Sequence, residues 1–200
     1  MTARGRFIAF EGVDGCGKTT QVRRVAEARG AVSTFEPGDT ELGASLRSIA
    51  LDPVAEMTPL AEVLVMAADR AQHVTQVIEP ALAAGHDVVC DRFSGSTLAY
   101  QGFGRGVALD DVRRIVEVAA CGLAPDVTIL LDCPPEVARE RRKGRAVDRF
   151  ESSDPAFATR VREGFLAIAA SSVTWRVVDA TQSLESVASA VDAAIASALS

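Results

Sequence analysis

The chain has 200 residues, 48% hydrophobic and 24% charged, a balance typical of a folded domain and not of a disordered or fibrous chain. No run approaches the ~20 apolar residues that a membrane-spanning helix needs, no signal-peptide pattern follows Met1, and a net charge of −6 disfavours non-specific binding to nucleic acid. We therefore expect a single soluble domain over residues 1–200, located in the cytoplasm, with no nucleic-acid or membrane partner.

Short apolar runs alternate along the chain with longer stretches of helical periodicity. The runs lack a strict polar alternation, as in strands that are buried on both faces of a parallel sheet. The predicted strands are 7–10, 31–35, 87–90, 127–131 and 175–178, and the predicted helices include 18–29, 61–84, 110–121, 135–142 and 184–199. This alternation predicts an α/β fold, a three-layer α/β/α sandwich around a five-stranded parallel sheet, with ligands at the carboxyl ends of the strands.

A phosphate-binding loop is predicted directly after the first strand. Residues 12–19 read GVDGCGKT and fit the GxxxxGK[ST] pattern, in which glycines let backbone N–H groups approach phosphates closely. We expect Lys18 to contact the β- and γ-phosphates of ATP and Thr19 to bind Mg²⁺. Cys16 is interpreted as a small loop residue, with an oxidisable thiol as the alternative. The candidate ATP-binding residues are Gly12, Val13, Asp14, Gly15, Cys16, Gly17, Lys18, Thr19 and Thr20.

An acid and a base, Asp91 and Arg92, follow the third predicted strand. The carboxyl end of a strand is where this architecture places its ligand, so the pair is well placed for phosphates. Asp91 is suited to holding hydrated Mg²⁺, and Arg92 to binding phosphoryl oxygens with its fork of donors. A structural ion pair that ends the strand is the alternative.

Residues 139–149 form the strongest charge cluster, with five arginines and one lysine. In phosphoryl transfer, arginines that close over the phosphates neutralise developing charge and exclude water. This pattern predicts a lid at about residues 142–153. A solvated helix end and a basic nucleic-acid patch are the alternatives.

A set of short motifs resembles one family over nearly the whole chain. In order, they are FEGVDG (10–15), EPG (36–38), AADRAQH (67–73), DRF (91–93), AYQG (99–102), GRG (104–106), LLD (130–132), DRFE (148–151) and RVREGFL (160–166). Together these motifs resemble the thymidylate kinases, which have the nucleoside-monophosphate kinase fold. The resemblance implies transfer of the γ-phosphoryl group of MgATP to dTMP, giving dTDP and ADP for dTTP supply. It also implies Mg²⁺ as the cofactor and a homodimer.

The resemblance implies roles for single residues. Asp14 resembles an acid near the acceptor ribose and phosphate, and Arg92 an arginine that holds the acceptor phosphate. Arg70 and Gln101 resemble the readers of the thymine edge, and Tyr100 a ring that fills the space of a ribose 2′-hydroxyl. From sequence alone, each has an alternative as a surface, loop or core residue. The implied acceptor-site residues are Asp14, Glu36, Arg47, Met66, Arg70, Arg92, Ser96, Thr97, Tyr100 and Gln101.

The catalytic arginine is expected from the lid. Gly15 stands where some thymidylate kinases carry an arginine, and the others, mostly bacterial, use a lid arginine, which makes Arg145 and Arg149 the candidates. The implied catalytic residues are Lys18, Arg92, Arg145, Arg149 and Asp14, and the implied metal-binding residues are Thr19 and Asp91.

Two acceptor-site positions depart from the family's pattern. Phe35 replaces the arginine that usually precedes Glu-Pro-Gly, and Met66 replaces a phenylalanine that stacks on thymine. Both departures permit another acceptor, so a kinase of dUMP or of a modified pyrimidine is the alternative enzyme. A nucleotide-binding regulatory switch is the alternative of a different class, and the missing NKxD motif argues against it.

Overall fold

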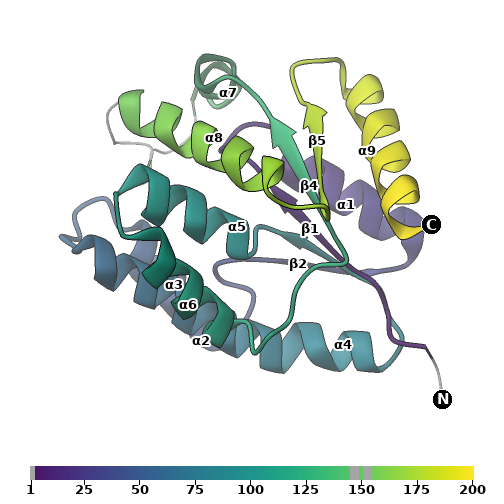
Figure 1. Ribbon diagram of the computed structural model, residues 1–200, viewed down its shortest axis with the longest axis horizontal. Helices are drawn as coiled ribbons and strands as arrows, with labels where there is room; N and C mark the ends of the chain where they lie inside the picture. Colours follow the sequence, from purple (N-terminus) through teal and green to yellow (C-terminus); the bar gives the residue numbers. More distant parts are fainter. Residues whose placement is uncertain (1–2, 145–148, 151–154) are drawn as a thin grey trace.

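The computed structural model describes residues 3–144, 149–150 and 155–200, and its strands form one parallel sheet in the order β2-β3-β1-β4-β5 (Figure 1). The strands are β1 (Phe7–Glu11), β2 (Val32–Phe35), β3 (Val88–Asp91), β4 (Val127–Asp132) and β5 (Trp175–Asp179). Each predicted strand is confirmed to within a residue at both ends, and so is the predicted sheet. The central strand β1 leads directly into the predicted phosphate loop.

Helices cover both faces of the sheet. Helices α1 (Lys18–Arg29) and α9 (Leu184–Leu199) pack on each other, and α9 contacts the same strands, β4 and β5, that α8 (Pro155–Ala170) contacts from the opposite side. The remaining helices are α2 (Glu41–Leu51), α3 (Pro59–His73), η1 (Val74–Ile78), α4 (Glu79–Ala83), α5 (Ser94–Thr97), η2 (Leu98–Gly104), α6 (Leu109–Ala119) and α7 (Pro135–Arg141).

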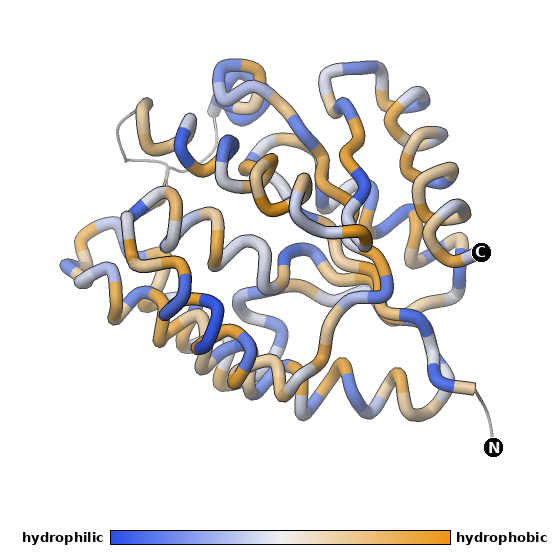
Figure 2. The backbone as a smooth tube through the Cα atoms, viewed as in Figure 1, coloured by the Kyte–Doolittle hydropathy of each residue, from blue (hydrophilic) through white to orange (hydrophobic). Residues whose placement is uncertain are grey.

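The core lies on both faces of β1. Because side chains alternate along a strand, Phe7 and Ala9 join the cluster that includes η1 and α4, whereas Ile8 and Phe10 join the cluster that includes α1 and α9. All four are fully buried. In Figure 2, hydrophilic and hydrophobic colours alternate along outer helices such as α9, as amphipathic helices require. Burial on both faces explains why the strands read as continuous apolar runs.

The helical regions differ from the sequence prediction in two ways. The predicted helix 61–84 is continuous but contains the π-helical turn η1, and it begins at Pro59, where Thr58 caps the first turn by accepting from the Ala61 N–H at 3.4 Å. Helices α2, α5, η2 and α8 were not predicted. Among residues 3–144, 149–150 and 155–200, no helix combines the length and hydrophobicity needed to cross a membrane.

Candidate active site

A pocket opens at the carboxyl ends of β1, β2 and β3. It has about 600 Å³ of empty space, its open mouth included. The structure brings all the sequence-predicted acceptor-site residues to its wall: Asp14, Glu36, Arg47, Met66, Arg70, Arg92, Ser96, Thr97, Tyr100 and Gln101. Phe150, which the sequence did not single out, lines it as well.

Three glycines of the phosphate loop have backbone conformations that favour glycine. Gly12, Gly15 and Gly17 have φ angles of 139°, 90° and 97°, a region that residues with a Cβ rarely adopt. A Cβ at Gly15 would also lie 2.4 Å from the carbonyl oxygen of Ala138. The loop therefore presents bare backbone, and the N-terminus of α1 follows it with the favourable end of its dipole toward an anion.

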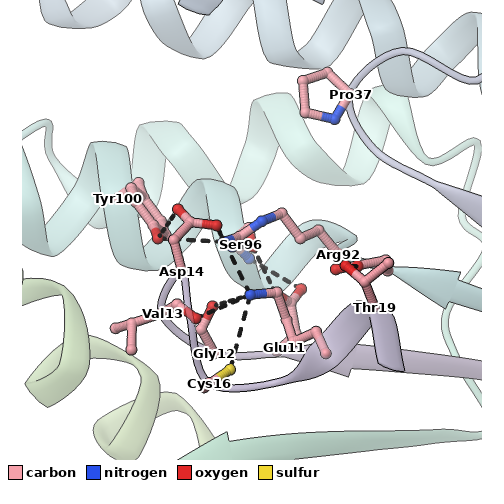
Figure 3. A network of polar contacts seen from close by, with 12 residues as sticks. Glu11, Gly12, Val13, Asp14, Cys16, Thr19, Pro37, Arg92, Ser96 and Tyr100 are labelled. Carbon is pink, nitrogen blue, oxygen red and sulfur yellow. Dashed lines mark hydrogen bonds and ion pairs between the residues drawn. The ribbon is translucent and has the colours of Figure 1, made fainter. Parts of the chain in front are cut away.

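Lys18 lies inside this loop. Its ammonium donates to the carbonyl oxygens of Gly12 and Val13, both at 3.0 Å, and lies 4.0 Å from Asp14 Oδ1 (Figure 3). The residue is buried. The positive charge is thus held within the turn that carries the loop's N–H groups, where it adds to their attraction for an anion.

The thiol of Cys16 is buried beneath the same loop. Burial raises its pKa, and the nearby positive charges of Lys18 and Arg92 do not offset that effect. A raised pKa lowers the thiolate fraction and with it the reactivity. The interpretation as a small loop residue is therefore the one that the structure supports.

The two predicted metal-binding residues meet between the loop and β3. Thr19 Oγ1, in the first turn of α1, donates to Asp91 Oδ2 at 2.7 Å. These hard oxygen atoms suit a small divalent cation. Among the described residues, no group of three or more His, Cys, Asp or Glu side chains is placed to hold a metal by itself. A cation at this position would therefore take its other ligands from phosphates and water, as Mg²⁺ does.

Arg92 anchors a polar network at the pocket floor (Figure 3). It donates to Asp14 Oδ1 at 2.7 Å, to Ser96 Oγ at 2.7 Å and to the Tyr100 hydroxyl at 3.3 Å, and that hydroxyl donates to Asp14 Oδ2 at 3.1 Å. Its φ of 72° is unusual for a residue with a side chain. Strand β3 is thus followed directly by a strained residue, Arg92, whose guanidinium lines the pocket.

Charges in this network set the ionisation of Asp14. Burial raises its pKa, but the Arg92 guanidinium and the Lys18 ammonium outweigh burial and hold the pKa well below its usual range. Asp14 is therefore ionised throughout the physiological range. Burial likewise raises the pKa of the Tyr100 hydroxyl, which stays protonated.

Sequence reasoning missed Glu11, the residue that holds this network in place. Its fully buried carboxylate accepts from the Phe93 and Ser96 N–H groups, both at 3.0 Å, and from Ser96 Oγ at 2.6 Å. These bonds tie the end of β1 to the turn that carries Arg92. The available signal was a carboxylate ending a buried strand immediately before the loop, a position that requires compensating hydrogen bonds.

Arg70 is fixed at the opposite end of the pocket by buried acids and hydroxyls. It donates to Thr97 Oγ1 at 3.1 Å and pairs with Glu36 Oε2 at 2.8 Å, and the other Glu36 oxygen lies 2.9 Å from His73 Nδ1. Arg70 is 2% exposed, so it is not the surface residue that the sequence left open. His73, which the sequence analysis did not select, completes the chain of contacts by its 2.5 Å approach to Thr34 Oγ1.

The two departures from the family pattern have different surroundings. Met66 lines the pocket. The exposed ring of Phe35 instead lies under the Arg47 guanidinium, at 5.7 Å from the ring centroid, while Arg47 donates to the Pro37 carbonyl oxygen at 2.6 Å. Phe35 thus does not line the pocket itself but contacts Arg47, which does.

Of the two lid candidates, Arg145 and Arg149, the structure describes only Arg149. Arg145 lies outside the described residues. Arg149 donates to Glu62 Oε2 at 2.7 Å and to the Ala50 carbonyl oxygen at 3.2 Å. Phe150 meets the Tyr100 ring edge-on, with the centroids 5.5 Å apart. In this structure, Arg149 and Phe150 thus lie against the acceptor end of the pocket.

Asp69, in the pocket wall, makes the stability of the folded protein depend on pH. It is buried and accepts from the Gly38 N–H at 3.0 Å, and burial, followed by the Glu36 carboxylate, raises its pKa to about 6. A raised pKa in the folded state stabilises the fold below about pH 4, and this contribution is lost as pH rises through about 6. We expect Asp69→Asn, which keeps an acceptor for Gly38, to raise the urea midpoint at pH 8 and to change it little at pH 4.

The control for Asp69→Asn is Asp110→Asn, at an exposed position on α6. It should not reproduce the pH-dependent gain in the urea midpoint. An equal midpoint for wild type and Asp69→Asn at pH 8 would contradict the expected destabilisation by the ionised carboxylate.

A family model described as thymidylate kinase matches residues 10–191. The thymidylate kinase of Prochlorococcus marinus (strain MIT 9313) is 48% identical over 200 aligned positions, which cover 94% of this chain and 92% of the relative. That of Synechococcus sp. (strain RCC307) is 47% identical, covering 89% of both chains, and that of Pelotomaculum thermopropionicum is 47% identical, covering 90% of this chain and 87% of the relative. The chain belongs to the thymidylate kinase family.

Proposed function

We propose that this chain transfers the γ-phosphoryl group of ATP to dTMP, giving dTDP and ADP. The observation that carries the proposal is one pocket with two chemically different ends. Arg92 lies at the end beside the phosphate loop, and Arg70 and Gln101 lie in the wall with Met66. A nucleoside monophosphate has the matching polarity, because its phosphate is anionic and its base presents carbonyl and N–H groups on an apolar ring.

The acceptor phosphate supplies the attacking oxygen. A phosphate monoester is largely ionised at neutral pH, so the reaction depends on positioning and charge neutralisation more than on a dedicated base. Three of the five N–H groups of Arg92 are used in the bonds to Asp14, Ser96 and Tyr100. Among the contacts of the described residues, this leaves Nε–H and one Nη1–H for the acceptor phosphate.

On the donor side, the loop's N–H groups and Lys18 hold the β- and γ-phosphates of ATP. Thr19 and Asp91 hold Mg²⁺, which supplies charge neutralisation to the phosphates when bound. Asp14 orients Arg92 and faces the acceptor's ribose. Of the two lid candidates, Arg145 is the one proposed to neutralise the charge that develops on the transferred group, because Arg149 is held at the acceptor end by Glu62 and Ala50.

Tyr100 discriminates between deoxyribose and ribose in the acceptor. Its ring is packed edge-on by Phe150 and Phe165, with centroids 5.5 and 6.1 Å away, and its hydroxyl is held by Asp14 and Arg92. Because both its ring and its hydroxyl are held in place, Tyr100 cannot easily move aside to make room for a ribose 2′-hydroxyl. That hydroxyl would be left poorly solvated, which disfavours ribonucleotides.

The test is a coupled ADP-release assay with ATP and a panel of dTMP, dUMP, UMP, dCMP and AMP. We expect dTMP to give the highest kcat/KM and UMP to trail dUMP. Since one methyl group in an apolar pocket contributes only ~1–3 kcal/mol, dUMP should be a weak substrate. Tyr100→Ala should reduce the preference for dUMP over UMP more than Tyr100→Phe.

The same panel decides between acceptors. If dTMP is inert and another monophosphate is turned over well, the alternative enzyme, a kinase of another pyrimidine nucleotide, replaces the proposal. If ATP binds but no monophosphate in the panel causes ADP to form, the protein is better described as a nucleotide-binding switch.

We also propose a homodimer formed through helices, with the enzyme working as one domain in the cytoplasm. Exposed hydrophobic side chains gather on three helices, of which α3 packs against both α2 and α6. They are Leu42, Ile49, Leu60, Leu64 and Val118. We take these exposed apolar side chains on packed helices as the candidate dimer interface. Sedimentation velocity should give a dimer for wild type and a monomer for Leu60→Asp/Leu64→Asp; a wild-type monomer at micromolar concentration would contradict the dimer.

A further inference from the structure

Glu62 is a buried acid behind the pocket that none of the roles above uses. It lies in α3 and is 1% exposed. Its Oε1 accepts from Gln101 Nε2 at 2.7 Å. Its Oε2 accepts from Arg149 Nη2 at 2.7 Å and pairs with Arg105 Nε at 3.4 Å. The carboxylate therefore joins a residue of the pocket wall to two arginines.

The bond to Glu62 fixes the orientation of the Gln101 amide, that is, the positions of its oxygen and its nitrogen. A carboxylate flanked by two guanidinium groups only accepts hydrogen bonds, so Gln101 must turn its NH₂ group toward Glu62. The reversed amide would press two oxygens together in a buried place, which is costly. Gln101 is itself 2% exposed and lines the pocket. Its carbonyl oxygen, at the other end of the amide, is thereby the acceptor that it offers to a ligand.

Together with Arg70, this orientation gives the pocket wall a fixed donor–acceptor pattern. Arg70 has only donors, and Gln101 held in this way offers an acceptor. The edge of thymine or uracil has the complementary pattern, a carbonyl oxygen beside a ring N–H. Cytosine has the opposite pattern, an amino group beside a ring nitrogen that accepts. Reversing the amide would therefore reverse the preference of that wall position.

We propose that Glu62 is a positioning residue that sets the base specificity of the acceptor site by holding the Gln101 amide in one orientation. Arg149 and Arg105 make this possible, because a buried carboxylate is tolerated only when it is paired. Arg149 is itself held by its bond to the Ala50 carbonyl oxygen at 3.2 Å. This inference rests on the proposed function, since it assumes a pyrimidine nucleotide in the pocket.

The first test is Glu62→Gln, which keeps the size of the side chain but offers either an oxygen or an NH₂ group to Gln101. We expect the ratio of kcat/KM for dTMP to kcat/KM for dCMP to fall at least ~10-fold, mainly through KM, because the amide is no longer held in one orientation. Calorimetric binding of each monophosphate replaces turnover where turnover is too slow to measure. Glu185→Gln, exposed on α9 and outside the pocket, is the matched charge control and should leave the ratio unchanged.

A double-mutant cycle with Gln101→Leu separates positioning from a general structural effect. In the Gln101→Leu background, the amide is gone, so Glu62→Gln should leave the dTMP-to-dCMP ratio unchanged. An equal fall of the ratio in both backgrounds overturns the inference. So does an unchanged ratio in Glu62→Gln alone. If wild type does not phosphorylate dTMP, it is the proposed function that fails.

Gln101→Glu is a second variant that leaves Glu62 in place, in case Glu62→Gln does not fold. The new carboxyl group faces Glu62, Arg105 and Arg149 on one side and Arg70 across the pocket. When protonated, it donates to Glu62 and offers its carbonyl oxygen to the base; when ionised, it is repelled by Glu62. We expect its kcat/KM for dTMP, relative to wild type, to rise as the pH falls from 8 towards ~4.3, the ordinary pKa of a glutamate, where the new carboxyl group becomes protonated. A pH profile parallel to that of wild type overturns the inference.

Discussion

Lys18→Met should lower kcat/KM for phosphoryl transfer by at least ~10³-fold, because it removes the charge that faces the β- and γ-phosphates and keeps most of the side-chain volume. The Lys18 ammonium lies within the loop, on the carbonyl oxygens of Gly12 and Val13. The loop's own conformation is set by its glycines, so the fold should survive. The coupled ADP-release assay with ATP and dTMP measures the loss, and circular dichroism checks the fold.

Measuring the ATP affinity of Lys18→Met distinguishes a loss of phosphoryl transfer from a loss of ATP binding. The backbone N–H groups of the loop remain, so we expect ATP to bind with a loss much smaller than the loss in kcat/KM. Arg114→Met, at an exposed position on α6 outside the pocket, is the control for loss of a basic side chain and should keep wild-type turnover. Wild-type turnover in Lys18→Met itself would refute the phosphate-loop assignment.

The sheet was predictable from sequence because its strands are buried on both faces. Runs such as Val127–Asp132 are mostly apolar, and they are separated by segments too long for hairpins. Helix α2 was missed for the opposite reason. Only Gly43 and Ala50 of its residues are buried, so the helix contributes little to the core, and its start depends on the local cap at Thr40.

The acceptor site was predictable residue by residue only through the family resemblance. Arg70 and Gln101 look like ordinary helix and loop residues in the sequence. What positions them is distant along the chain: Glu36 for Arg70, across 34 residues, and Glu62 for Gln101, across 39. Sequence patterns report local periodicity and spacing, whereas these pairs exist only once the sheet brings β2, α3 and η2 together. This explains why the supporting residues Glu11, Glu62 and His73 were not selected.

The second large effect is expected for Arg92→Met, which should lower kcat/KM for dTMP by about 10²–10³-fold. Arg92 is the cation that the structure presents at the pocket floor between Asp14 and Tyr100, 5.1 Å from the ring centroid of Tyr100. Its loss also removes the main charge that holds the pKa of Asp14 low. Burial then acts against the remaining Lys18 charge, so the pKa of Asp14 is held down less strongly.

Arg92→Lys separates charge from geometry. Both residues meet the same backbone strain at a φ of 72°, so the comparison is not distorted by the backbone. Lysine restores a positive charge beside Asp14, but a compact ammonium cannot hold Asp14, Ser96 and a phosphate at once as the guanidinium fork does. We expect Arg92→Lys to recover part of the loss, chiefly in kcat, while KM for dTMP stays high. If lysine restores full kcat/KM, charge alone suffices, and the fork geometry at the end of β3 has no special part in holding the acceptor phosphate.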